Sequence, residues 1–438
     1  MSPHPHVPSS LRRELYDWRL WAGRALVLAF AMLAGLTVVL LTWLTEQALA
    51  LFFALERAAW WAPLLWTPLL TTGIVWCTRR WFVGAAGSGI PQVMAALAPE
   101  TPPQARSLFV SMRLTAGKLL LTASGCLAGL SLGREGPSVQ IAAGVMHHTR
   151  RWLPQPSQVS DQGLLIAGGA AGIAAAFNTP LGGVMFAIEE LSRRPEQRNN
   201  GLVLAAIVLA GLMAVSLHGN ATHFGTIRVE ALSWPLLWPG LLVAISCGVA
   251  GGLFARTLAA AQAGQALRVW MVWRERAPLR FAAACGLAVA LLGIVSQGEV
   301  FGGGYLHTRA MLENTVDASP WYAPMKWLAT WITALSGVPG GIFAPSLAIG
   351  GALGNDIAQW TQHASAPTLI ALGMAGFLAA VTQAPLTAFI IVMEMVDGHA
   401  LVLSLMACSL VASAVSRLIS RPLYSTLAEL QLRRLPLQ

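Results

Sequence analysis

The sequence contains few charged residues. Only 11% of its 438 residues are Asp, Glu, Lys or Arg, whereas soluble domains carry about 25%. Hydrophobic residues make up 55% of the chain, so it could not cover a globular surface with polar side chains. This composition excludes an ordinary soluble domain and predicts an all-α polytopic membrane protein.

Cysteine is also scarce, and the usual signatures of bound cofactors are missing. The five cysteines lie apart in apolar segments without a C-x-x-C spacing, which predicts small buried residues rather than disulfides or metal ligands. There is no H-E-x-x-H motif or nucleotide-binding glycine loop. None of the nine histidines has a metal-ligand spacing on a recognisable helix. We therefore expect no metal and no cofactor.

Basic residues outnumber acidic ones, 28 to 19, which gives a formal net charge of +9. In a soluble protein this balance would suggest a nucleic-acid partner. Here the arginines cluster at the ends of apolar runs, as they do in the cytoplasmic loops of membrane proteins. We expect a cytoplasmic N-terminus, no nucleic acid, and a weak overall preference for anions.

Several uncharged runs along the chain have a length close to the roughly 20 residues that a helix needs to cross a membrane. They cover 25–44, 58–78, 201–217, 231–255, 271–273 with 281–298, 327–355, 364–393 and 400–416. The chain has 42 glycines and 25 prolines, and many of the runs are interrupted by them. Such broken spans suit a transporter or channel whose irregular backbone lines a cavity.

The two halves of the chain resemble each other. GREGPSVQIAAG from Gly133 aligns with GIFAPSLAIGGA from Gly341, and Pro180 and Glu189 fall on Pro385 and Glu394, at an offset of about 205–208 residues. Chance similarity between helices rich in small residues is the alternative. We divide the chain into a cytoplasmic tail (1–19), a first repeat (20–217), a loop (218–230), a second repeat (231–430) and a C-terminal tail (431–438). Duplicated transporters often have inverted halves with the site at their interface.

The most distinctive stretch is SLGREGPSVQ, residues 131–140, in which Arg134 and Glu135 stand side by side among glycines. Ionisable groups at membrane depth are costly and mark ion or proton pathways. A helix that starts near Pro137 would direct its free N–H groups back toward the same place. The sequence therefore predicts a carboxylate at a point that also attracts anions.

Three short segments share one pattern, in which glycines precede a proline at or near a helix start. They are Gly87-Ser88-Gly89-Ile90-Pro91, Gly133-Arg134-Glu135-Gly136-Pro137 and Gly340-Gly341-Ile342-Phe343-Ala344-Pro345. Glycines leave backbone amides accessible, and helix N-termini carry a partial positive charge. Three such termini together could hold an anion without a full positive charge and still release it quickly.

These segments, in this order and spacing, resemble the signature segments of the CLC family of chloride channels and chloride/proton antiporters. The similarity runs from about Arg24 to Leu430 and includes Lys118, AAAFNTPLGGVMFAIEE around Asn178, and the C-terminal RPLYSTLAE. It resembles the prokaryotic type without an appended regulatory domain. The resemblance implies two inverted-topology repeats of tilted, broken helices. It also implies a homodimer with one anion pathway per subunit.

The resemblance also implies the anion ligands. Ser88 would be the inner ligand, Tyr424 would close the inner end of the site, and Ile342 and Phe343 would offer backbone N–H groups. The alternatives are a serine bonded to its own helix and a tyrosine that anchors a span at the membrane interface. Serine rather than methionine at position 88 argues against the family's fluoride-selective branch.

Two glutamates receive roles from the same resemblance. Glu135 would block the pathway as a carboxylate and swing aside when protonated; the alternative is a salt bridge with Arg134. Glu190 matches the internal proton-transfer glutamate of the antiporters; the alternative is that Glu189 and Glu190 form a charged pair at the membrane boundary. We interpret Glu189, which aligns with Glu394, as structural.

The combined hypothesis is a chloride/proton antiporter gated by Glu135. A passive chloride channel is the first alternative, and an intramembrane enzyme using Ser88 or Glu135 is the second. The enzyme is disfavoured because a nucleophile needs a base within reach and these motifs contain no histidine. We expect a multi-pass protein of the bacterial inner membrane whose partners are chloride, protons, lipid and a second copy of the chain.

Overall fold

The computed structural model describes residues 17–154, 159–192, 200–218, 224, 234–265, 268–313, 315–316, 318–362 and 365–433. Across these ranges the chain is helical, and its extended contacts are two isolated bridges, Gly87 with Pro339 and Gly133 with Gly341. The expected tails and the 218–230 loop lie almost wholly outside the described residues.

The first half contains eight α-helices among its described residues. They are α2 (Trp18–Ala58), α3 (Pro63–Trp81), α4 (Ile90–Leu97), α5 (Met112–Leu127), α6 (Glu135–His148), α7 (Asp161–Phe177), α8 (Pro180–Phe186) and α9 (Asn200–His218). Short 3₁₀ turns, η1 (Ala105–Leu108) and η2 (Thr149–Arg151), and a π-helical turn, η3 (Ala187–Leu191), follow α4, α6 and α8 respectively.

The second half continues in the same manner. Its helices are α10 (Leu237–Gln262), α11 (Arg268–Arg276), α12 (Pro278–Val295), α13 (Tyr305–Leu312), α14 (Tyr322–Ser336), α15 (Phe343–Trp360), α16 (Ala366–Thr382), α17 (Pro385–Met395), α18 (Val402–Ile419) and α19 (Leu423–Leu432). Two 3₁₀ turns, η4 (Trp234–Leu236) and η5 (His399–Leu401), precede α10 and α18.

Two apolar runs that look continuous in the sequence are divided in the structure, and a third that the sequence gives in two pieces is divided as well. Residues 327–355 form parts of α14 and α15, residues 364–393 form α16 and α17, and the two pieces at 271–273 and 281–298 belong to α11 and α12. The breaks fall at Gly337–Ile342, at Gln383–Ala384 and at Ala277, each followed within three residues by a proline. Because proline lacks the N–H that would extend a helix, these sites end one helix and start the next.

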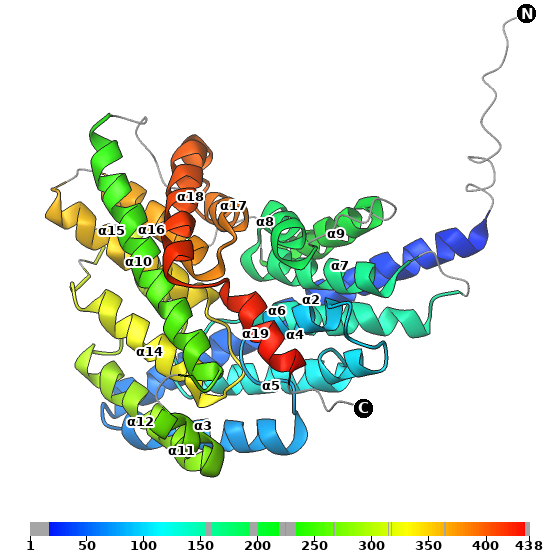
Figure 1. Cartoon of the computed structure of the whole chain (residues 1–438), viewed down its shortest axis with the longest axis horizontal. Coiled ribbons are helices and arrows are strands. Elements are labelled where there is room, and N and C mark those ends of the chain that lie inside the picture. The colour runs from blue at the N-terminus through cyan, green and yellow to red at the C-terminus, as the bar shows by residue number, and fades with distance from the viewer. Residues whose placement is uncertain are drawn as a thin grey trace, which may run out of the picture.

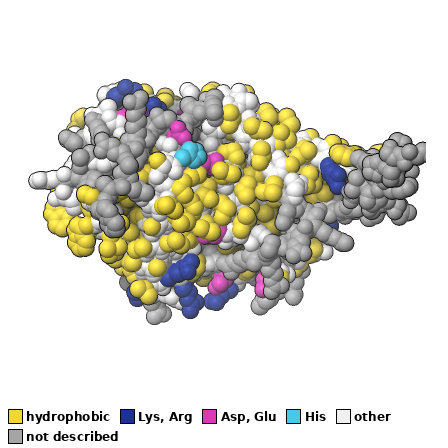
Figure 2. Space-filling model, turned by 90° about the horizontal axis from the view of Figure 1, so that it is seen from above, with side chains coloured by type: hydrophobic (Ala, Val, Ile, Leu, Met, Phe, Trp, Pro, Cys, Tyr) yellow, Lys and Arg dark blue, Asp and Glu magenta, His cyan; other side chains and the backbone are white. Residues whose placement is uncertain are grey.

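The chain is an integral membrane protein. Four described segments are long and apolar enough to cross a membrane: Trp18–Ala58, Leu237–Gln262, Pro278–Val295 and His399–Ile419. Large apolar side chains are exposed on α8, α9, α17 and α18, among them Leu181, Leu212, Leu386 and Leu403. The face above these helices in Figure 1 is mostly apolar (Figure 2), as expected for a surface in contact with lipid or another apolar partner.

Two reciprocal contacts relate the halves. The Glu189 carboxylate accepts hydrogen bonds from the amides of Leu386 and Thr387 at 3.2 and 2.7 Å. The Glu394 carboxylate accepts from Leu181 and Gly182 at 3.3 and 2.8 Å. Each half therefore caps the first turn of the other half's helix, α17 or α8, and a carboxylate there is favoured by the helix dipole.

Buried lysines repeat the same relation. Lys118 on α5 donates to the carbonyls of Ala85 and Gly87 at 2.7 and 2.6 Å. Lys326 on α14 donates to Val300 and Gly302 at 2.8 and 2.7 Å. Each ammonium thereby satisfies carbonyls of the irregular loop that leads into α4 or α13. In Figure 1, α19 crosses beside α4 at the meeting place of the two halves.

Candidate functional site

The starts of α6 and α15 are held together by a pair of backbone hydrogen bonds. Gly133 N donates to Gly341 O at 2.7 Å, and Gly341 N donates to Gly133 O at 2.8 Å. Both helices begin directly after this bridge, at Glu135 and Phe343. Their free N–H groups therefore emerge at the same point, although they are about 200 residues apart in the chain.

The loop before α4 joins the same place through a second bridge. Gly340 N donates to Gly87 O at 3.1 Å, and Gly87 N donates to Val338 O at 3.3 Å. Gly89 precedes α4 with φ +109°, and a Cβ on Gly136 would lie 2.2 Å from Ser88 Oγ. Only glycine fits at these two positions, so the glycine pattern in the sequence reflects close contact between the helix starts.

The prolines lie inside the first turns. Pro91 is the second residue of α4, while Pro137 and Pro345 are the third residues of α6 and α15. We expected α6 to start near Pro137, but it begins two residues earlier. As a result Glu135 is itself the first residue of the helix, and its side chain starts from the convergence point.

Glu135 is fully buried, with 0% of its surface exposed. Its Oε1 accepts a hydrogen bond from the Tyr305 phenol at 2.5 Å, and its Oε2 accepts from the Ala344 amide at 3.3 Å. The carboxylate thus lies at the N-terminus of α15. A negative group is stabilised there by the helix dipole and by direct donation from the backbone.

The neighbouring Arg134 forms its ion pair elsewhere. Its Nη1 lies 2.8 Å from Glu46 Oε1 on α2, and its guanidinium carbon lies 5.7 Å from the centre of the Tyr305 ring. The sequence alternative of an Arg134–Glu135 salt bridge is therefore not the ion pair that the structure forms. The arginine instead braces the start of α6 against α2 and the Tyr305 ring.

Ser88 and Tyr424 bring two hydroxyls to this region. Ser88 Oγ and Tyr424 Oη are both buried and lie within interaction range of each other, and neither makes a hydrogen bond of good geometry in the described part of the chain. Tyr424 lies in the first turn of α19, is 1% exposed, and stacks on Phe343 with ring centroids 5.9 Å apart. Both hydroxyls are buried donors that can turn toward a bound anion, and Tyr424 is not at a solvent-facing interface.

Ile342 and Phe343 provide the remaining backbone groups. Both are buried, with Ile342 at the N-cap of α15 and Phe343 at its first position. Amides at these positions have no acceptor within their own helix. The Phe343 ring packs against Phe177, Phe186 and Tyr424, so the side chain fixes the position of the helix start while the amide stays available.

Glu189 and Glu190 take different directions from the π-helical turn η3. Glu189 caps α17, in agreement with its interpretation as structural. Glu190 is buried, with 8% of its surface exposed, and is not a solvated residue of a charged boundary pair. The Tyr424 phenol lies within electrostatic range of both Glu190 and Glu135, which places the three groups in one region of the molecule.

Sequence reasoning missed Tyr305 and Glu46. Tyr305 follows Gly302-Gly303-Gly304, a glycine-rich approach to a helix that occupies the same place before α13 as GSG does before α4. That glycine run is the signal that could have marked Tyr305. Glu46 lies in the middle of the long helix α2, and no local pattern distinguishes it.

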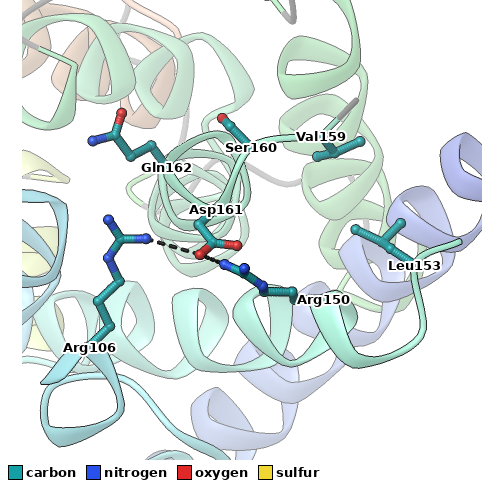
Figure 3. Close-up of a pocket in the computed structure, with 7 residues that line it drawn as sticks. All are labelled: Arg106, Arg150, Leu153, Val159, Ser160, Asp161 and Gln162. Carbon is teal, nitrogen blue, oxygen red and sulfur yellow. Dashed lines mark hydrogen bonds and ion pairs between the residues drawn. The ribbon is translucent and has the colours of Figure 1, made fainter. Parts of the chain in front are cut away.

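A separate pocket of about 350 Å³ lies at the other end of α6. Figure 3 shows Arg106 and Arg150 on two sides of Asp161, and both pair with its carboxylate. The 14 residues of α6 put about 20 Å between this end and Glu135. The pocket is therefore not part of the site at the helix starts. Among the described residues, no cluster of His, Cys, Asp and Glu could hold a metal ion.

Comparison with known proteins places this geometry in context. Residues 70–417 match the family model described as "Voltage gated chloride channel". The H(+)/Cl(-) exchange transporter ClcA of Citrobacter koseri is 30% identical over 399 residues, which cover 85% of this chain and 81% of that protein. ClcA of Cronobacter sakazakii is 30% identical over 424 residues, covering 90% and 87%.

Solved structures agree in fold. A slow cyanobacterial Cl⁻/H⁺ antiporter superposes with a TM-score of 0.77 at 26% identity, covering 96% of this chain and 99% of that one. A CLC-type fluoride/proton antiporter superposes with a TM-score of 0.76 at 23% identity, covering 94% and 98%. The second likeness concerns the fold alone.

Proposed function

The chain belongs to the voltage gated chloride channel family, also called CLC, and we propose that it is a chloride/proton antiporter gated by Glu135. The main support for this proposal is the position of the Glu135 carboxylate, which accepts a hydrogen bond from the Ala344 amide at the N-terminus of α15. A chloride ion needs the same kind of donor. The carboxylate and the anion therefore compete for one place.

The anion pathway continues inward from this gate. Ser88 and Tyr424 donate their two buried hydroxyls to a chloride ion, while the amides of Ile342 and Phe343 face it from the start of α15. Neutral donors bind the ion without the full charge that would trap it. When Glu135 is deprotonated it blocks the path outside this ion, and when it is protonated it loses its attraction for the amides and leaves room for chloride.

The proton needs a second carboxylate on the inner side, and Glu190 supplies it. Glu190 is buried, and it lies within electrostatic range of the Tyr424 phenol, as Glu135 does. Protons pass between Glu190 and Glu135, so chloride and proton occupancy are linked through one side chain. A channel has no need of a buried inner carboxylate, and the relatives named above are exchange transporters. Both points favour antiport.

The protein acts in the bacterial inner membrane as a homodimer in contact with lipid, and it transports ions rather than catalysing a reaction or using a cofactor. The reciprocal caps of Glu189 and Glu394 bring α8 and α17 together. Leu181, Ile188 and Leu386 are exposed beside them, on an apolar face that suits a second copy of the chain. A monomeric mass in mild detergent would contradict the dimer.

The direct test of the transport cycle uses purified protein in liposomes, with chloride and proton movements recorded together. We expect an outward chloride gradient to drive protons inward against their own gradient. Glu135→Gln should keep chloride movement and abolish proton movement, because glutamine resembles a permanently protonated gate. Chloride flux without proton pumping in the wild type would instead identify a channel.

A further inference from the structure

Tyr305 makes the shortest contact to the gate. Its phenol donates to Glu135 Oε1 at 2.5 Å, on the opposite carboxylate oxygen from the one that the Ala344 amide contacts. The gate side chain is therefore held from two directions, by a backbone amide of α15 and by the first residue of α13. The amide belongs to the helix N-termini already described, whereas the phenol comes from outside them.

The Tyr305 ring is fixed in this position by its neighbours. The Arg134 guanidinium lies 5.7 Å from its centroid, and the Phe224 ring lies at 5.6 Å. Arg134 is in turn tied to Glu46 on α2 by a 2.8 Å ion pair. Gly304, directly before Tyr305, has φ +86° and a Cβ there would lie 2.5 Å from that of Ala348. The phenol thus has little freedom to follow the carboxylate when the gate moves.

We propose that Tyr305 is a positioning residue that holds the deprotonated Glu135 in its blocking position and so sets how readily chloride displaces it. This inference rests on the proposed role of Glu135 as the gate. A hydrogen bond to a charged acceptor is roughly twice as strong as a neutral one. Chloride must replace the carboxylate at the α15 N-terminus. The free energy of the hydrogen bond from the phenol to the carboxylate therefore lowers the affinity for chloride.

The test removes only the hydroxyl, with Tyr305→Phe. We expect chloride to bind to the detergent-purified variant about tenfold more tightly than to the wild type in calorimetric titrations, because a hydrogen bond to a charged group contributes at least that factor. Chloride turnover in liposomes should rise, with the number of protons per chloride unchanged. A variant that is merely loosened would bind chloride more weakly, not more tightly.

Tyr322→Phe is the matched control. Tyr322 is a fully buried tyrosine whose hydroxyl has no hydrogen-bond partner in the described part of the chain, and it lies near Gly304. Its substitution should leave chloride affinity unchanged.

A double-variant cycle with Glu135→Ala completes the test. Without the carboxylate the phenol has nothing to hold, so adding Tyr305→Phe to Glu135→Ala should not change chloride affinity. Equal affinity in wild type and Tyr305→Phe, or the same gain in the Glu135→Ala background, would overturn the proposal. A wild type that shows no proton pumping would reject the antiporter assignment itself, which is a separate outcome.

Discussion

At the scale of single residues, two adjacent glutamates in one turn have different surroundings. Glu189 points across to the other half and accepts two backbone hydrogen bonds, while Glu190 is buried near the Tyr424 phenol. The local π-helical geometry of residues 187–191 separates the two side chains. Such turns are rare and frequently occur at functional sites.

The pair provides its own matched comparison. Glu190→Gln should spare chloride movement and abolish proton movement, because the inner proton carrier is gone. Glu189→Gln should leave the coupling intact and lower thermal stability by about 1–3 kcal/mol, because it weakens two charge-assisted caps. Liposome flux and thermal unfolding in detergent measure the two effects. Loss of coupling in Glu189→Gln alone would reverse the assignment.

Sequence reasoning proposed candidate residues that lie within one short segment and missed contacts between distant segments. Ser88, Glu135 and Phe343 each lie within a glycine–proline segment, so the local pattern draws attention to them and the family resemblance suggests their roles. Tyr305 and Glu135 are separated by 170 residues, and Arg134 and Glu46 by 88. Contacts of this kind depend on how helices pack, which the spacing of residues within one segment does not encode.

At the scale of elements, the site exists because four helices start where the two halves meet. The sequence indicated three of these starts from Gly–Pro patterns and the fourth from resemblance. Its glycines and prolines indicated broken spans but not where each run divides, because a continuous run of apolar residues has the same composition whether it forms one helix or two. The breaks depend on single prolines and left-handed residues such as Gln383, with φ 60°.

Gly136→Ala tests the packing of these helix starts. The added Cβ would lie 2.2 Å from Ser88 Oγ and 2.9 Å from Ser88 O, so the loop before α4 must move and the anion ligands must separate. We expect chloride binding to fall by more than tenfold. Gly73→Ala in α3 is the control, since its Cβ meets nothing within 4 Å, and alanine is favoured over glycine in a helix by about 1 kcal/mol. Normal chloride binding in Gly136→Ala would contradict this packing.

At the scale of the whole molecule, the two halves use the same internal supports. Lys118 and Lys326 are both fully buried, and each donates to two carbonyls of a loop that precedes a helix start. A buried ammonium is expensive unless its donors are satisfied. Their matched positions indicate that each half uses a buried lysine to supply hydrogen-bond donors to the carbonyls of the corresponding loop.

Substituting either lysine by methionine should destabilise the protein by a similar amount, about 2–5 kcal/mol, because two buried carbonyls lose their donor in each case. Unfolding in detergent followed by circular dichroism measures this effect. Lys118→Met should also weaken chloride binding, because its loop carries the proposed anion ligand Ser88. Unchanged stability in both variants would mean that the buried ion–carbonyl contacts contribute little.

The central claim is that the carboxylate of Glu135 and a chloride ion compete for the N-terminus of α15. Anomalous diffraction from crystals grown in bromide tests it most directly, with wild type and Glu135→Ala compared. We predict a bromide peak between Ser88 Oγ and Tyr424 Oη in both proteins and a further peak beside the Ala344 amide in Glu135→Ala only. No bromide at the Ala344 amide in the variant, or a peak there in the wild type with Glu135 still in place, would contradict the account.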